Sequence, residues 1–291
     1  MKTRHMKIIK HNFLNKHTIP GALLLMLWGL LFSEMIIGGV FAIPDLILDP
    51  ETREPVIGAF GSAAAAFLVL SIHWVWFYPE FEGCLKSKVP FSDICRIAAA
   101  IIPFWLLTII KEIAAGNSFH APTIRIIAMA LMAGCCEEVS FRGLGISYLM
   151  RQWKDEKKIL PALVFTSVIF GLVHASNIIS GAGVLISIIQ SVSAAFIGLF
   201  LGAVFLRGGN LWAAIIIHVI HDILSGMFLT EGFVLTHTVT WSDWLDMLIC
   251  AFLGAAGLYL VRREKRAEIA ALWAQKWAGT AGDPEISQEA S

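Results

Sequence analysis

Charged residues are scarce in this chain of 291 amino acids. Asp, Glu, Lys and Arg together make up 15% of the residues, against roughly 25% in a typical soluble domain. The 22 basic residues are balanced by 22 acidic ones, so the formal net charge is zero. A zero balance argues against a protein that binds nucleic acid through bulk basicity. It also argues against a disordered chain, which combines low hydrophobicity with high net charge.

Cysteine is also sparse, and its spacing does not indicate a disulfide framework. The five cysteines, Cys84, Cys95, Cys135, Cys136 and Cys250, give an odd number without regular spacing. We expect most of them to act as small apolar packing residues. Cys136 directly precedes an acidic pair and is therefore kept as a minor candidate for a nucleophile. No cysteine stands near the C-terminus, so the protein is not expected to be a prenylation substrate itself.

Apolar residues are in excess, at 57% of the chain, and the mean hydropathy is +0.73. A membrane span needs ~20 mostly apolar residues, and eight runs approach that length. The runs cover residues 19–43, 56–78, 94–110, 124–148, 159–174, 183–205, 211–229 and 244–261. They lack the period-2 alternation of barrel strands. The sequence therefore predicts an all-α, polytopic membrane helix bundle with about eight transmembrane helices and no soluble domain.

The few charges are divided unevenly between alternate loops. Basic residues gather before the first run and after the second, fourth, sixth and eighth runs: Lys2, Arg4, Lys7, Lys10, Lys16, Lys86, Lys88, Arg151, Lys154, Lys157, Lys158, Arg207, Arg262, Arg263, Lys265 and Arg266. The opposite loops hold the basic residues Arg53, Lys111 and Arg125 and the acidic residues Asp45, Asp49, Glu51, Glu54, Glu112, Glu231 and Asp243. Because Lys and Arg favour cytoplasmic loops, we expect both termini in the cytoplasm.

Segments of different character flank the bundle. The predicted order is a basic cytoplasmic arm (1–18), the transmembrane bundle (19–261), an interfacial helix (262–278) and a disordered tail (279–291). The interfacial helix is expected because Ile269, Trp273 and Trp277 share one helix face. The tail is rich in Gly, Asp, Pro, Ser and Glu. The chain shows no eukaryotic targeting signal, so we expect a multi-pass protein of a bacterial inner membrane.

One predicted span carries an acidic pair and an arginine. Glu138 and Arg142 are four residues apart, so they share a helix face and can form an ion pair. Glu137 points about 100° away from that face and is left as a free carboxylate. Ionisable groups in hydrocarbon are costly, so a free carboxylate at this depth predicts a function.

Two later spans carry histidines. Phe170 and His174 share one face, as do His218 and Asp222, so the Asp222 carboxylate can orient the imidazole. His221 lies on a neighbouring face and is a second possible histidine of that motif. A Glu beside a His can act as a general base toward water, and another His can donate to a developing oxyanion. The pattern favours hydrolysis of a peptide bond within or beside the bilayer.

Two other ionisable residues within the predicted spans have open roles. Glu34 and His73 are interpreted either as neighbours of the site or as partners of Arg142 or Arg96.

In chain order, the three motifs resemble those of a known family. Glu-Glu-x-x-x-Arg (137–142), Phe-x-x-x-His (170–174) and His-x-x-x-Asp (218–222) are similar to the motifs of the CPBP family, also called Abi. This family holds the CAAX proteases and bacteriocin-processing enzymes, including the Ras-converting type of prenyl endopeptidase. The resemblance covers roughly residues 122–230. It implies a glutamate-dependent intramembrane endopeptidase that needs no metal and no other cofactor.

The resemblance also assigns roles to residues. It implies that Glu137 is the general base, that His174 helps to activate water, and that His218 and residue 222 stabilise the oxyanion. Glu138, Arg142 and Phe170 are then supporting residues. The family often has Asn at the last position, whereas an ionised Asp222 cannot donate a hydrogen bond. We therefore assign Asp222 to orienting His218.

Two other interpretations stay open. A zinc protease would use Glu137, His174 and His218 as a His₂Glu site, although the chain has no His-Glu-x-x-His motif. A non-catalytic immunity, scaffolding or transport protein could use the same fold. The expected partner is a membrane-associated protein or peptide in the lipid bilayer, and not nucleic acid. Its candidates are a prenylated CaaX tail, a bacteriocin leader and a C-terminal sorting segment.

Overall fold

The structure is a computed structural model, and it describes residues 13–40, 50–228 and 237–278. Within these ranges every regular element is a helix, and none is a strand. Several residues used to predict topology lie outside them: Lys2, Arg4, Lys7, Lys10, Asp45, Asp49, Glu231 and the tail 279–291. The side chains of Glu34, Glu51, Arg53 and Glu54 are also outside the described part.

Helices occupy all eight apolar stretches. In chain order they are α1 (Phe13–Lys16), α2 (Thr18–Val40), α3 (Pro50–Ile72), η2 (His73–Phe77), α4 (Phe91–Ala98), α5 (Ile101–Ala114), α6 (Ile124–Glu138), η3 (Val139–Ile146), α7 (Ser147–Gln152), η4 (Glu156–Lys158), α8 (Ile159–His174), η5 (Ala175–Ile178), α9 (Val184–Gly208), α10 (Leu211–Gly226), α12 (Trp241–Leu260) and α13 (Arg263–Ala278). The prediction of an all-helical protein is therefore confirmed.

Among the described residues, four helical stretches are long and apolar enough to cross a membrane. They are Pro55–Phe77, Glu156–Ile178, Val184–Gly208 and Trp241–Leu260. The bent pair α4 and α5 makes a fifth if it forms one span. The count of eight spans and the cytoplasmic position of both termini remain predictions.

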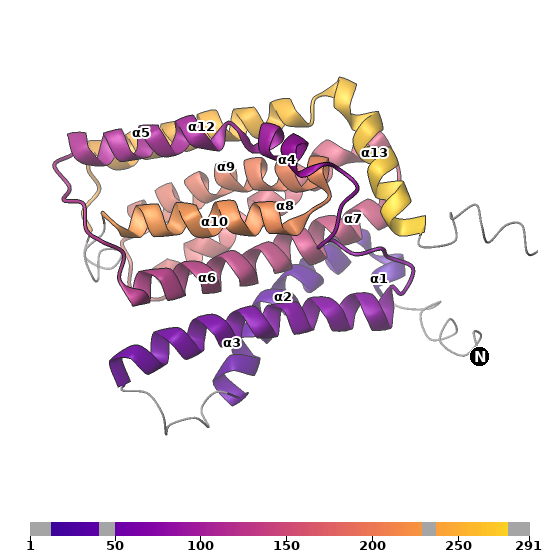
Figure 1. Ribbon diagram of the computed structural model, residues 1–291, viewed down its shortest axis with the longest axis horizontal. Helices are drawn as coiled ribbons and strands as arrows, with labels where there is room; N and C mark the ends of the chain where they lie inside the picture. The colour runs from indigo at the N-terminus through magenta and orange to yellow at the C-terminus, as the bar shows by residue number, and fades with distance from the viewer. Residues whose placement is uncertain (1–12, 41–49, 229–236, 279–291) are drawn as a thin grey trace, which may run out of the picture.

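The long helix α9 lies inside the bundle, between α8 and α12 (Figure 1). Close packing with α12 depends on Gly257, because a Cβ atom there would lie 2.6 Å from the Leu199 carbonyl oxygen. On the opposite side of the bundle, α6 packs against α3 and α10. Many large side chains stay exposed on the outer faces, such as Phe60 (65%) and Phe252 (69%), as a lipid-facing surface requires.

The run predicted at 94–110 differs from a single span. It consists of α4 and α5, which meet at a bend of 41°. Because α5 continues to Ala114, Lys111 and Glu112 lie in a helix, so their assignment to a loop was wrong. The Lys111 side chain is 7% exposed, and its ammonium lies 2.7 Å from Glu112 Oε1 and 2.9 Å from Asp246 Oδ1. These partners neutralise the lysine, so it does not weaken the charge asymmetry between the loops.

The helix α13 runs across one end of the bundle, near α1 and α7 (Figure 1). Ile269 and Trp273 are buried, and the Trp273 indole donates to the Leu206 carbonyl at 3.0 Å. The Lys276 ammonium donates to the carbonyls of Gly83 (2.9 Å) and Lys86 (2.7 Å). Burial lowers the pKa of Lys276. The apolar face of α13 is thus docked onto the protein itself.

Candidate active site

Two of the predicted motifs meet at His218. Its Nδ1 lies 2.8 Å from Glu138 Oε1, which makes a hydrogen bond between α10 and α6. Its Nε2 lies 3.7 Å from Glu137 Oε2 and 3.5 Å from Asp222 Oδ2. The imidazole therefore faces three carboxylates. Of the two histidines proposed for the third motif, His218 is the one that lies next to both glutamates.

Glu138 is the anchor of this cluster. Its side chain is fully buried, and Arg142 Nη1 donates to Oε1 at 2.9 Å. The second Arg142 nitrogen, Nη2, donates to the Gly198 carbonyl on α9 at 3.3 Å. The arginine is also buried. Together with the His218 bond, these contacts link α6, η3, α9 and α10.

Glu137 is held differently from its neighbour. Its side chain is 21% exposed, whereas that of Glu138 is fully buried. The Oε2 atoms of both glutamates are buried and have no hydrogen-bond partner among the described residues, but Glu138 Oε1 is bonded to Arg142 and His218. Glu137 also lies beside the Nε2 side of His218. Glu137 is thus the carboxylate of the pair that remains available to a reacting molecule.

The Phe170 ring sits between the two histidines. Its centroid is 5.1 Å from that of His174 and 6.0 Å from that of His218. The Arg142 guanidinium stacks over the same ring at 4.4 Å, a favourable cation–π geometry. Phe170 is 2% exposed. It forms the apolar wall that joins the second motif to the other two.

The tautomer of His174 follows from its hydrogen bond. Its Nδ1 lies 3.0 Å from the Phe170 carbonyl oxygen. Because a carbonyl only accepts, Nδ1 must carry the hydrogen. In the neutral ring Nε2 is then the acceptor. A nitrogen that accepts is what a group needs in order to take a proton from water. His174 is half-buried, and it lies within electrostatic range of Asp222.

Asp222 lies beside His218, whereas His221 lies on another side of α10. The Asp222 side chain is 30% exposed. The distance from Asp222 to His218 is 3.5 Å, longer than the 2.8 Å from Glu138 to His218. The contact between Glu138 and His218 was not predicted from the sequence. The His221 ring lies 5.3 Å from that of Phe104 on α5. Its Nδ1 is buried and has no hydrogen-bond partner in the described ranges. His221 thus faces α5, on another side of α10.

The close approach of α10 to α6 depends on Gly134, one turn before Glu138. A Cβ atom there would lie 2.5 Å from Val219 Cγ2 and 3.3 Å from the Val219 nitrogen. Val219 directly follows His218. A side chain at position 134 would therefore press on Val219, the neighbour of His218. A glycine at this position indicates in the sequence that another helix packs closely there, but it does not indicate which helix.

The helix changes its geometry directly after the acidic pair. Residues Val139–Ile146 form the π-helix η3, and all eight are buried. Stretches of π-helix occur frequently at functional sites. The pairing of Glu138 with Arg142 spans this transition.

Three other residues considered in the sequence lie elsewhere. His73 is buried in an aromatic cluster, with its ring 4.5 Å from Trp74 and 5.4 Å from Phe77. Arg96 pairs with Asp93 at 2.9 Å. The Cys136 thiol is directed toward the Ser62 carbonyl oxygen at 3.4 Å. The structure thus brings none of the three to His218.

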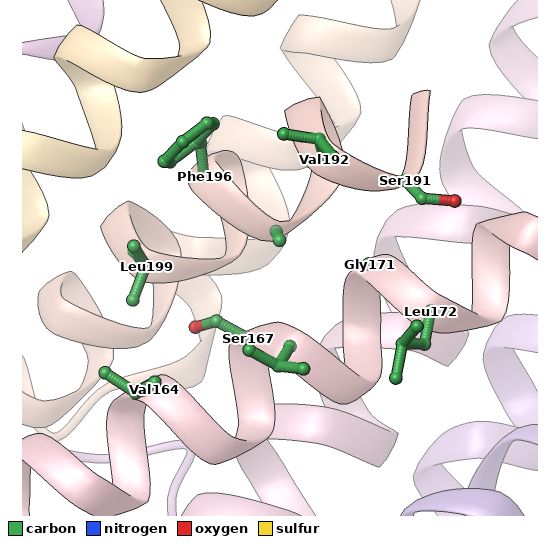
Figure 2. Close-up of a pocket in the computed structure, with 10 residues that line it drawn as sticks. Val164, Ser167, Gly171, Leu172, Ser191, Val192, Phe196 and Leu199 are labelled. Atoms are coloured by element: carbon green, nitrogen blue, oxygen red, sulfur yellow. The ribbon is translucent and has the colours of Figure 1, made fainter. Parts of the chain in front are cut away.

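A shallow apolar hollow of about 290 Å³ lies between α8 and α9. Figure 2 shows its lining, in which Ser167 and Ser191 contribute the polar atoms and Val164, Leu172 and Leu199 are apolar. None of the predicted site residues lines it. The hollow is therefore separate from the Glu137–His218 cluster.

A zinc site would require several His, Cys or carboxylate ligands around one point. In the part of the chain that the structure describes, no group of three His, Cys, Asp or Glu side chains is arranged to hold a metal ion.

Residues 119–224 match the family of Rce1-like type II CAAX prenyl endopeptidases. This Rce1-like segment begins before α6, includes all three motifs and ends within α10. The match confirms the resemblance of this segment to CAAX-type membrane proteases that was seen in the sequence. Comparisons with curated proteins and with solved structures found no match.

Proposed function

We propose that this protein is a glutamate-dependent intramembrane endopeptidase that needs no metal. The observation that carries the proposal is the convergence of Glu137, Glu138 and His218 from two helices, with distances of 2.8 and 3.7 Å to the imidazole. The Rce1-like segment, which contains these residues, supports the same reaction class.

The proposed reaction begins with a water molecule between Glu137 and the scissile carbonyl. Glu137 takes a proton from this water, assisted by the free Nε2 of His174, and the hydroxide attacks the carbonyl carbon. The resulting tetrahedral oxyanion accepts a hydrogen bond from His218. Glu137 then returns the proton to the leaving nitrogen, the C–N bond breaks, and a carboxylic acid and an amine are released.

The supporting residues fix the positions of the reacting ones. Glu138 accepts from His218 Nδ1 and thereby orients the ring, as a buried carboxylate does for the histidine of a catalytic triad. To donate through Nε2 as well, His218 must be doubly protonated, and Glu137 and Asp222 lie beside it to balance that charge. Arg142 holds Glu138 in turn.

The substrate proposed is a membrane-associated protein or peptide. A prenylated CaaX tail is favoured by the family match, and bacteriocin leaders and C-terminal sorting segments remain alternatives. The first test uses the purified full chain in nanodiscs with a farnesylated CaaX peptide, and mass spectrometry of the products.

In this assay Glu137→Gln is expected to lower the cleavage rate by about 10²- to 10⁴-fold, the usual worth of a general base. The control is Glu156→Gln, which makes the same change on an exposed residue and is expected to leave the rate unchanged. Equal cleavage by wild type and Glu137→Gln contradicts the mechanism. Loss of activity with a chelator, restored by zinc, contradicts metal independence alone.

Substrates in the cell are sought by comparing membrane proteomes of cells that express wild type or Glu137→Gln. Uncleaved precursors are expected to accumulate in the variant. If the two proteomes are the same and no peptide is cleaved, the protein is a non-catalytic member of its fold.

The proposed topology has eight spans and cytoplasmic termini in a bacterial inner membrane. The common location of α1, α7 and α13 at one end of the bundle supports it (Figure 1), because the loops near α7 and α13 are rich in Lys and Arg. Labelling of single cysteines placed at Lys88 and Ser118 tests this orientation. The first is expected to react only from the cytoplasm and the second only from outside.

A further inference from the structure

A second cavity lies at the end of the bundle where α13 crosses α7. Its volume is about 280 Å³, several times the ~30 Å³ that one water occupies in the liquid. Arg151 and Lys154 line it on the side of α7, and Trp277 lines it on the side of α13. Two alanines of α13, Ala270 and Ala274, complete an apolar wall. Cationic and apolar surfaces therefore face the same space.

The two cations of this cavity are held differently. Arg151 lies 3.2 Å from Glu80, donates to Asn15 at 3.0 Å, and stacks over the Tyr78 ring at 4.0 Å. These contacts fix its guanidinium and balance part of its charge. Lys154 is exposed, and within the described residues no carboxylate lies in ion-pair distance of it. An anion in the cavity therefore meets one positioned cation and one uncompensated cation.

The position of the cavity limits what the anion can be. The α13 helix crosses the end of the bundle (Figure 1), so the cavity lies at the depth of the lipid headgroups when the apolar helices span the bilayer. Tryptophan prefers this depth. A small soluble anion has no apolar part that could pack on Ala270 and Ala274. A lipid does, because its glycerol and first methylene groups would cover this wall.

We propose that this cavity binds the headgroup of an anionic phospholipid. The phosphodiester contacts Arg151 and Lys154, and the glycerol region packs on the alanine wall beside Trp277. Basic pockets between helices at a membrane surface are suited to this chemistry. The proposal concerns lipid binding alone, so it holds whether or not the protein cleaves peptides.

The test is native mass spectrometry of the full chain, titrated with phosphatidylglycerol or with zwitterionic phosphatidylcholine. Lys154→Gln is expected to weaken the binding of phosphatidylglycerol about fivefold, the effect of one cation near an anionic surface. The matched control is Lys88→Gln, another exposed lysine that does not line the cavity. Ala274→Trp fills the cavity without changing any charge, and it is also expected to abolish tight binding.

Four outcomes overturn the proposal. Lys88→Gln weakens binding as much as Lys154→Gln, which means that general surface charge is responsible. Ala274→Trp leaves binding intact, so the lipid lies elsewhere. Phosphatidylcholine binds as tightly as phosphatidylglycerol, so the negative charge of the headgroup does not contribute to binding. Inorganic phosphate binds at the same concentrations as the lipid, which identifies a soluble anion as the ligand.

Discussion

Adding a single methyl group at Gly134 tests whether the packing of α6 against α10 sets the geometry of the site. The Cβ of Gly134→Ala would lie 2.5 Å from Val219 Cγ2, and carbon atoms reach ordinary contact near ~3.5 Å. Because the Val219 backbone nitrogen is also close, at 3.3 Å, we expect the α10 helix to retreat by about 1 Å. The distance from His218 to Glu138, now 2.8 Å, would exceed the limit of a hydrogen bond.

The expected loss of cleavage is about 10²-fold, because a displacement of 1 Å in an active site has that effect. The accompanying loss of stability is roughly 1–3 kcal/mol, as for other overpacked cores. Cleavage of the farnesylated peptide and thermal unfolding of the full chain measure the two effects separately.

Val219→Ala removes the atom that the new methyl group strikes, so the double variant is expected to regain most of the lost activity. Gly58→Ala is the matched control, because a Cβ atom at Gly58 would meet nothing within 4 Å. Wild-type activity in Gly134→Ala refutes the reasoning, and so does a double variant no better than Gly134→Ala alone.

Three further predictions concern buried charges. Glu138→Ala leaves its arginine partner buried and unpaired, so the free energy of unfolding should fall by about 3–5 kcal/mol; denaturant titration measures it, and an unchanged midpoint contradicts it. Lys111→Met leaves two carboxylates without their cation and should cost a similar amount, about 3–5 kcal/mol, visible as a lower thermal midpoint. Because burial lowers the pKa of Lys276, the unfolded chain binds the proton more tightly, up to about pH 10. Stability should therefore rise with pH below that value, and Lys276→Met should remove this slope.

The predictable part of the site was local in the sequence. Glu138 and Arg142 are one helical turn apart, so their pairing follows from helix geometry, and the structure shows it. The bond from His218 to Glu138 joins residues 80 positions apart. No periodicity encodes which helices become neighbours, so Asp222, one turn away, was the only orienting partner that the sequence offered.

The same limit applies to charges at helix ends. Lys111 was assigned to a loop because the apolar run ends at Ile110. Its partner Asp246 lies 135 residues further along the chain, and their contact allows α5 to continue with a lysine inside. Hydropathy alone reads such a lysine as the end of a helix.

The π-helix η3 affects the direction in which the side chains after residue 146 point. Each residue of an α-helix advances the direction of its side chain by about 100°, and η3 contains more residues than an α-helix of the same number of turns. Because η3 takes up its extra residue within the same turns, the segment that follows keeps its direction; in regular α geometry the extra residue would turn that segment by about 100°. Tyr148, whose hydroxyl binds the Leu14 carbonyl, and Arg151, which pairs with Glu80, would then face other neighbours. A homologous chain that lacks one residue of η3 should therefore also lack its π geometry.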